Sequence, residues 1–236
     1  MERTAILLLL TVAVPSGKLV PLFGLDPGQE YFPISAFTID RNPVTHAEFR
    51  KFVRDHKEWS RAKASAPLVD SGYLAIDSGI PDLGPATQVS WFAAQAYCES
   101  KGGRLPDTLD WEYVAAADQT RPDATRDPVF ASTILNWYAK PSRGPVTSVI
   151  GAGKPNFYGV SDLHALIWEW TFDFNSVFVT ADNRQDGDKS ADFTCGNGAT
   201  ASSDRGNYAA FMRYAMRNSL QAHHTSLNLG FRCAYY

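Results

Sequence analysis

Apolar positions in the first part of the chain repeat with the spacing of an α-helix. Phe49, Phe52 and Val53 form one stripe, and Thr45 with the Glu three residues later has the form of a capping box at the start of that helix. Residues 37–40 are predicted to form a short strand just before it. This segment therefore predicts a strand followed by an amphipathic helix.

Two further helices are predicted in the next part of the chain. Ser90 is expected to cap one helix, which Gly102 and its neighbouring glycine end. Asp107 is expected to cap the next, which carries Trp111 on its apolar face. Residues 56–86, between the first and second helices, have weak periodicity and several Gly and Pro, which indicates a loop.

Beyond residue 117 the pattern changes to short apolar runs between turn residues. Short strands or extended segments are predicted at residues 136–138, 167–174 and 231–235. Residues 182–203 are rich in Asp, Gly, Asn and Ser, which indicates a long surface loop. Helices early and short strands late favour a single α+β domain with little regular secondary structure.

The first residues have the pattern of a cleaved leader. Arg3 precedes an apolar stretch at residues 5–14, and a small, turn-forming cleavage zone follows at residues 15–17. About ten apolar residues are too few to span a bilayer. We therefore expect a signal peptide at residues 1–17 and a secreted protein, most simply in a bacterial periplasm. A buried N-terminal strand is the alternative for the same residues.

Composition narrows the class of protein. An apolar content of 44% and a charged content of 20% are those of an ordinary soluble globular protein. The net charge of -3 and the lack of a basic cluster argue against nucleic acid as a partner. Three cysteines permit one disulfide and one leftover thiol.

Four short segments stand in a fixed order along the chain. They are Pro-Val-Thr-His-Ala-Glu-Phe at 43–49, Arg-Leu-Pro running on to Trp-Glu-Tyr at 104–113, Trp-Glu-Trp-Thr at 168–171, and Leu-Gly-Phe-Arg-Cys at 229–233. Together they resemble the formylglycine-generating enzyme family, also called the sulfatase-modifying factor family. The resemblance covers about residues 37–234 and implies the C-type-lectin-like α+β fold of that family. The expected organisation is a leader at 1–17, an N-terminal extension at 18–36 and a family domain at 37–236.

The resemblance also implies roles for particular residues. It pairs Cys98 with Cys233 in a disulfide, which leaves Cys195 as the odd thiol. It places Glu169 at an acidic position that helps to hold calcium, so calcium is a candidate cofactor. The Asn that usually precedes this segment in the family is Leu166 here, which removes an oxygen ligand.

The copper chemistry of the family does not carry over. The two cysteines that bind copper(I) in the family fall near Asp204 and Ala209, and neither is Cys. Soft thiolate ligands select copper(I), so these residues are not simple replacements. The candidate catalytic groups are Cys195, Asp204, Arg217 and His223. Their alternative interpretation is a structural thiol and surface histidines.

A groove is the other feature that the sequence suggests. Trp168 and Trp170 are two residues apart on an extended segment, so one is expected to enter the core and the other to line a groove. Arg213 and Arg217 are four apart and would share one side of a helix, suited to binding a carboxylate or a carbonyl. The alternative is internal ion pairing of Arg104, Arg217 and Arg232 with Glu112, Glu169 or Asp173.

Residues 158–173 and 204–220 look closest to secreted relatives tied to pyoverdine maturation and to accessory proteins of copper nitrite reductase. The first hypothesis is therefore an oxidative maturation or accessory factor, a possible oxidoreductase, that acts on a peptide or protein in the periplasm. The second is a non-catalytic module that binds a peptide or protein on the same fold. Copper-dependent formylglycine generation on sulfatases ranks last. No membrane contact is expected after leader removal.

Overall fold

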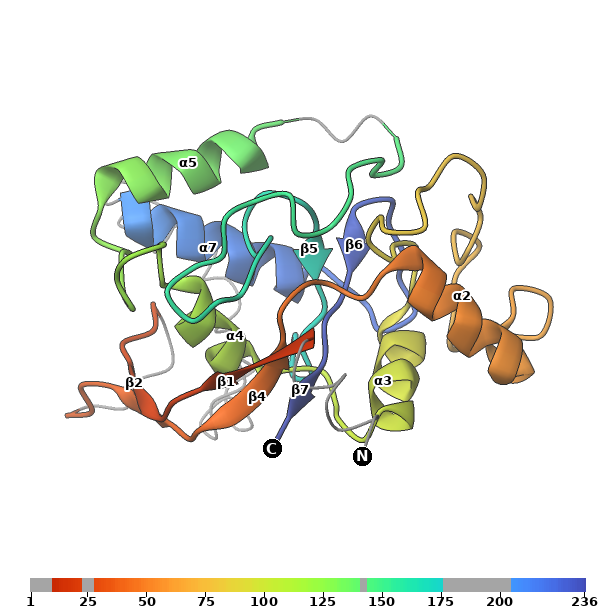
Figure 1. Cartoon of the computed structure of the whole chain (residues 1–236), viewed down its shortest axis with the longest axis horizontal. Coiled ribbons are helices and arrows are strands. Elements are labelled where there is room, and N and C mark those ends of the chain that lie inside the picture. The colour runs from red at the N-terminus through yellow and green to blue at the C-terminus, as the bar shows by residue number, and fades with distance from the viewer. Residues whose placement is uncertain (1–9, 23–27, 141–143, 176–204) are drawn as a thin grey trace, which may run out of the picture.

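A computed structural model describes residues 10–22, 28–140, 144–175 and 205–236. Short strands stand near both ends of the described chain, and most of the helices lie between them in sequence (Figure 1). In chain order they are β1 (Thr11–Val14), β2 (Gly17–Leu19), β3 (Phe32–Ile34), β4 (Phe37–Asp40), α2 (His46–Asp55), the 3-10 turn η1 (Lys57–Trp59), α3 (Trp91–Ser100), α4 (Thr108–Ala115), α5 (Pro128–Tyr138), β5 (Trp168–Glu169), α7 (Arg205–Asn218), β6 (Leu229–Gly230) and β7 (Ala234–Tyr235). The α+β class with short strands agrees with the sequence prediction.

The central sheet has three antiparallel strands in the order β1-β4-β7. The strand predicted at residues 37–40 is confirmed as β4, its middle strand, and Ile39 at its centre is fully buried. Two smaller ladders accompany it: β2 pairs with β3, and β5 pairs with β6 in the parallel sense. The first described strand and the last strand therefore lie in one sheet, on opposite sides of β4.

Residues 11–14, which the sequence predicts as the end of a leader, form β1 of the central sheet. Val14 is buried, and β2 and β3 from the expected N-terminal extension contact α4. Gly17 lies so close to Tyr113 that an added Cβ would come 2.1 Å from the phenol oxygen. A buried N-terminal strand therefore describes residues 11–14, and the folded unit begins before the boundary expected at residue 37.

The predicted helix starts are confirmed for α2 and α3. The Thr45 hydroxyl accepts from the Glu48 amide, and the Glu48 carboxylate accepts from the Thr45 amide at 2.9 Å, which completes the capping box. The Ser90 hydroxyl accepts from the Ala93 amide. Asp107 differs, because its carboxylate accepts two bonds of 2.6 Å from Arg104 and does not cap α4.

A disulfide joins α3 to the segment that enters β7. Cys98 and Cys233 are both fully buried and lie 135 residues apart in sequence. This is the pair that the family resemblance implies. Around the bridge, Phe49, Tyr97 and Phe231 pack with ring centroids 5.4–5.9 Å apart. The bridge therefore ties α3 to the C-terminal strand inside one core cluster.

The prediction of a strand at residues 136–138 is wrong, because these residues form the last turn of α5. Asp127 caps this helix through its carboxylate, and Pro128 occupies its first turn, as helix starts favour. In Figure 1, α5 lies alongside α7, and the two helices are in contact. The capped start at Asp127 and the packing against α7 both favour helix at the aromatic end of α5, which taken alone favours strand.

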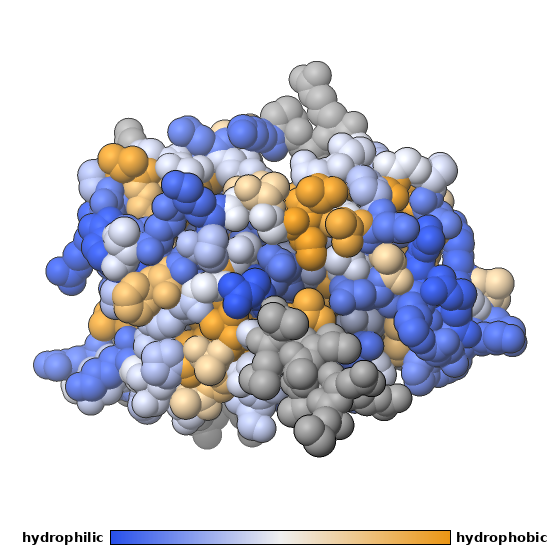
Figure 2. Space-filling view, in the orientation of Figure 1, coloured by the Kyte–Doolittle hydropathy of each residue, from blue (hydrophilic) through white to orange (hydrophobic). Residues whose placement is uncertain are grey.

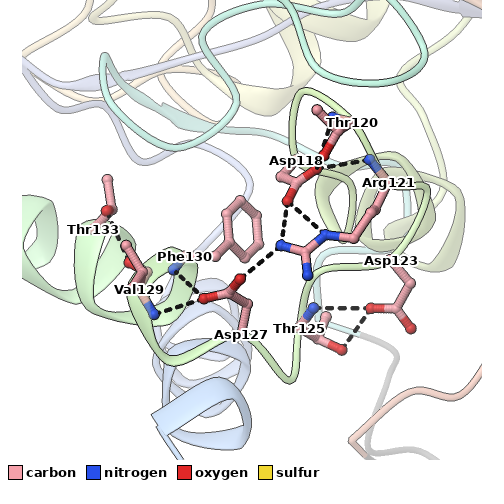
Figure 3. A network of polar contacts seen from close by, with 9 residues as sticks. All are labelled: Asp118, Thr120, Arg121, Asp123, Thr125, Asp127, Val129, Phe130 and Thr133. Atoms are coloured by element: carbon pink, nitrogen blue, oxygen red, sulfur yellow. Dashed lines mark hydrogen bonds and ion pairs between the residues drawn. The ribbon is translucent and has the colours of Figure 1, made fainter.

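A network of exposed polar contacts fixes the turn before α5 (Figure 3). Arg121 donates to Asp118 and, at 2.7 Å, to Asp127, the same residue that caps α5. Asp123 accepts from the amide and the hydroxyl of Thr125 in a second small turn. These contacts set the position at which α5 starts and thus the place of its far end.

His164 is enclosed between Trp111 and Phe130, whose rings meet it edge-on with centroids 5.9 and 5.7 Å away. Its Nε2 lies 2.7 Å from the Ala115 carbonyl oxygen, to which the neutral ring donates. Burial, followed by the nearby charge of Arg213, lowers the pKa of His164 to about 4.

In the part of the chain that the structure describes, no helix has both the length and the apolar composition needed to span a membrane.

Removal of the disulfide should lower stability strongly. The double variant Cys98→Ala/Cys233→Ala is expected to lose about 4 kcal/mol of unfolding free energy, because the bridge restricts the unfolded chain across a long loop. Urea denaturation followed by tryptophan fluorescence measures this. Reduction of the wild type should give the same loss, and a reduced protein as stable as the oxidised one would contradict the bridge. Thiol titration in denaturant should find one reactive thiol per chain.

His164 should make stability depend on pH. Its folded-state pKa of about 4 lies below the ordinary value of 6.5, so the unfolded chain binds the extra proton first and stability falls as pH drops from about 6.5 towards 4. Between pH 7 and pH 5 this amounts to about 2 kcal/mol at most. His164→Gln, which keeps a donor for the Ala115 carbonyl, should flatten the curve of unfolding free energy against pH. Equal slopes in both proteins would refute the assignment.

Candidate functional site

A cavity of about 440 Å³ opens between the end of α5 and the start of β5. Three aromatic rings form its wall: Trp168 stacks on Tyr138 with centroids 4.7 Å apart, and Trp137 meets Trp168 at 5.3 Å. All three side chains are half-buried. The remaining lining residues are Lys140, Gly144, Pro145, Val146, Thr147, Leu166 and Asn228. We call this cavity the aromatic pocket.

Trp168 lies in β5 and Trp170 directly follows it. Their side chains point to opposite sides of the extended segment, as the sequence predicts. Trp168 lines the aromatic pocket, whereas Trp170 is fully buried and donates its indole N–H to the Val89 carbonyl at 2.8 Å. Trp170 is therefore the core residue of the pair, and as a candidate groove residue it does not line the aromatic pocket. The alternation of side chains along an extended segment produces this division.

Arg213 supports the aromatic pocket from behind. It donates to the Tyr138 hydroxyl at 3.2 Å and to the Glu112 carboxylate at 2.6–3.0 Å. Arg213 and Arg217 are both buried on one side of α7, and Arg217 donates to the same carboxylate at 2.7 Å. Neither arginine lines the cavity, so the alternative of internal ion pairing holds for Arg217. Its assignment as a catalytic residue does not fit this placement.

Arg213 and Arg217 keep the Glu112 carboxylate ionised. Burial by itself would raise the pKa of Glu112, but the charges of Arg213 and Arg217 outweigh it and hold the pKa at about 2. The Arg217 guanidinium also lies over the Trp111 ring, 4.5 Å from its centroid. A carboxylate bonded to two arginines in this way cannot serve as a base near pH 7. The role of Glu112 is to position α7 against α4.

Glu169 is the centre of a second buried cluster. Both of its carboxylate oxygens accept from Arg232, at 2.7 and 2.8 Å, and one also accepts from the Trp111 indole at 2.8 Å. Arg232 continues to the Ser161 carbonyl at 2.9 Å. A calcium ion needs free oxygen ligands, so Glu169 with both oxygens bonded to Arg232 does not fit the predicted calcium site. Among the residues that the structure describes, no group of three His, Cys, Asp or Glu side chains could hold a metal ion.

Of the other predicted catalytic groups, His223 lies within the described residues. His223 is half-buried in the turn after α7, where its carbonyl accepts from the Asp70 amide at 3.0 Å, and it is not a lining residue. Cys195 and Asp204 lie outside the described residues, so their roles stay predictions.

Ala209, near which the family resemblance places the second copper cysteine, is buried on α7. It lines a very small cavity with Phe130 and Ile134 of α5. The described residues therefore offer no thiolate at this position and no open space around it. They do not fit a copper(I) centre of the family's type.

Two wall residues, Trp137 and Tyr138, are absent from the sequence-based site. A usable signal exists, since the Asp127-Pro128 helix start places the adjacent aromatic pair at the end of a helix of ordinary length. A strand at residues 136–138, as predicted, does not place this pair beside Trp168.

Comparison with known proteins supplies the family. A family model described as the sulfatase-modifying factor enzyme 1-like domain matches residues 11–236. The inactive C-alpha-formylglycine-generating enzyme 2 of Bos taurus is 29% identical over 250 residues, which covers 85% of this chain and 77% of the relative. Hercynine oxygenase of Mycolicibacterium smegmatis is 28% identical over 159 residues, which covers 58% of this chain and 37% of the relative.

Among solved structures, PvdO from Pseudomonas aeruginosa superposes with a TM-score of 0.49 at 16% identity, over 95% of this chain and 93% of that one. A likeness of this size carries no argument about function. The family match is different in kind, since it runs from β1 to the last residue of the chain. The chain therefore belongs to the sulfatase-modifying factor enzyme 1-like family, that of the formylglycine-generating enzyme.

Proposed function

We propose that this chain is an accessory or maturation factor that binds a peptide or protein segment in the aromatic pocket. The observation that carries the proposal is the wall of stacked rings from Trp137, Tyr138 and Trp168. The volume of the aromatic pocket, about 440 Å³, falls in the range of pockets that enclose a small ligand or a side chain.

The lining combines features that suit a peptide. Stacked rings offer a face to an apolar or aromatic side chain. Around them the lining includes the Asn228 amide, the Thr147 hydroxyl and the Lys140 ammonium, which can bond to peptide carbonyls or to a carboxylate. A hydrophobic wall with a few convergent polar groups is the usual composition of a specific binding site.

Contacts within the protein also hold the wall in place. Tyr138 is bonded to Arg213, which is fixed by the buried Glu112 carboxylate on α4. A wall fixed in this way loses little side-chain freedom when a ligand arrives, which favours affinity. The Arg213–Glu112 ion pair thus supports the binding surface.

A second candidate is oxidation of the bound segment. The relative named hercynine oxygenase favours it. On this chain the chemistry would fall to groups such as Cys195, Asp204 and His223, which the sequence singles out. We also propose action outside the cytoplasm, in the periplasm, because the Cys98–Cys233 disulfide is typical of oxidising compartments.

Trp168→Ala should weaken ligand binding at the aromatic pocket. With N-acetyl-tryptophanamide as the probe, we expect about a fivefold rise in Kd, because loss of one stacked ring removes on the order of 1 kcal/mol. Titration by NMR or calorimetry measures this. Phe157→Ala removes an exposed ring elsewhere and serves as the matched control. If the two variants bind the probe like the wild type, the pocket is not the binding site.

Metal content separates the two candidates. The binding proposal predicts less than stoichiometric copper and iron in the purified chain, and an unchanged melting temperature in chelator. Elemental analysis of the wild type and of Cys195→Ala provides the measurement. A redox metal near one per chain that disappears in the variant would establish the oxidative candidate instead.

A further inference from the structure

A second cavity, of about 550 Å³, lies against α2, in the other half of the molecule from α5 (Figure 1). None of its lining residues belongs to the aromatic pocket. They are His46, Phe49, Arg50, Val53, Arg54, Arg61, Leu74, Ile76, Asp77, Ala86 and Thr87. We call this the α2 cavity.

The α2 cavity has an apolar floor. Phe49 and Val53 are one turn apart on α2 and so share a side of the helix. Leu74 and Ile76 face them from the following loop, and Ala86 completes the surface. A floor of this composition favours the apolar body of a ligand over a bare inorganic ion.

Three arginines border this floor. Arg50 and Arg54 are also one turn apart on α2, and Arg61 comes from the loop opposite. Arg61 donates to the Tyr73 carbonyl at 2.9 Å and to the Ser71 carbonyl at 3.2 Å, so these contacts orient its guanidinium without cancelling its charge. The guanidinium fork is suited to bind a carboxylate in two-point fashion.

The opposing negative charge is small. Of the described residues that line the α2 cavity, Asp77 alone is acidic, and it lies 2.8 Å from His46 Nε2 and 3.9 Å from Arg50. Arg50 also lies 3.4 Å from Asp82, and both of these aspartates are mostly exposed, so the pairs are weak. The lining is therefore positive on a chain whose net charge is -3. In Figure 2 the surface over α2 is mostly hydrophilic, in contrast to this floor.

The loop that forms one wall is held in a strained conformation. Leu74 and Gln88 have φ values of 45° and 58°, in the left-handed region that side chains other than glycine rarely adopt. The Leu74 amide donates to the Gln88 carbonyl at 3.1 Å, and the Gln88 side chain makes two bonds of 3.1 Å to the Ile76 backbone. Backbone strain persists where the surroundings enforce it, and binding sites are where it gathers.

We infer that the α2 cavity binds an organic anion that carries a carboxylate on an apolar body. The arginines would hold the carboxylate, and Phe49, Val53 and Leu74 would cover the body. A volume of about 550 Å³ suits a ligand of roughly drug size. A fatty acid and the carboxyl terminus of a short hydrophobic peptide share this chemistry, and different probes distinguish them.

Calorimetry with octanoate, below its micelle concentration, tests the inference. Octanoate should bind, while acetate, which lacks the body, and octanol, which lacks the charge, should bind at least about tenfold more weakly. N-acetyl-Leu-Phe against its C-terminal amide provides the peptide arm. Whichever acid binds more tightly identifies the source of the carboxylate.

Variants on α2 locate the site. Arg50→Gln/Arg54→Gln should weaken octanoate binding about tenfold. Lys51→Gln removes the same kind of charge from a neighbouring exposed position of α2, outside the lining, and should change Kd less than about twofold. Melting curves confirm that each variant is folded.

Three outcomes would overturn the inference: octanol binding as tightly as octanoate, equal effects of the arginine variant and Lys51→Gln, or absence of octanoate binding at 5 mM. Trp168→Ala should leave octanoate binding intact. This last comparison separates failure of the α2 cavity from failure of the aromatic pocket.

Discussion

Two buried carboxylates hold distant parts of this molecule in register. Glu112 on α4 pairs with Arg213 and Arg217 on α7, about a hundred residues later in the chain, and Glu169 pairs with Arg232. Loss of one partner from such a pair typically costs about 3–5 kcal/mol, because the other charge is left buried and alone. Removing the whole pair is a different change, so these contacts specify an arrangement more than they add net stability.

The parts of the fold that depend on contacts between residues near in sequence can be predicted from the sequence alone. Thr45 and Ser90 cap their helices because each needs only the amide three residues ahead. Asp107 also stands directly before a helix, but its carboxylate accepts from Arg104 and not from the amides of the first turn. Capping rules do not take such a competing partner into account. The aromatic end of α5 has residues typical of a strand, and the signal for a helix, the start at Asp127 and Pro128, stands a whole helix earlier in the sequence. The aromatic residues taken alone therefore do not predict the wall of the aromatic pocket.

The candidate site residues show the same difference between local properties and contacts across the domain. The alternation of Trp168 and Trp170 is a local property and was predictable, whereas the burial of Arg217 against Glu112 depends on a contact across most of the domain. A sequence shows that arginines four apart share a helix side, but not what lies opposite that side. The disulfide was available only through family resemblance, since three cysteines allow three pairings.

The C-terminal segment has a consequence for biosynthesis. Arg232, Cys233 and β7 lie within the last few residues, and they supply the partner of Glu169, half of the disulfide and the third strand of the central sheet. None of these contacts can form until residues 232–235 have been synthesised. The domain therefore cannot reach its native state before this segment is available, and deletion of residues 232–235 would remove all three contacts at once.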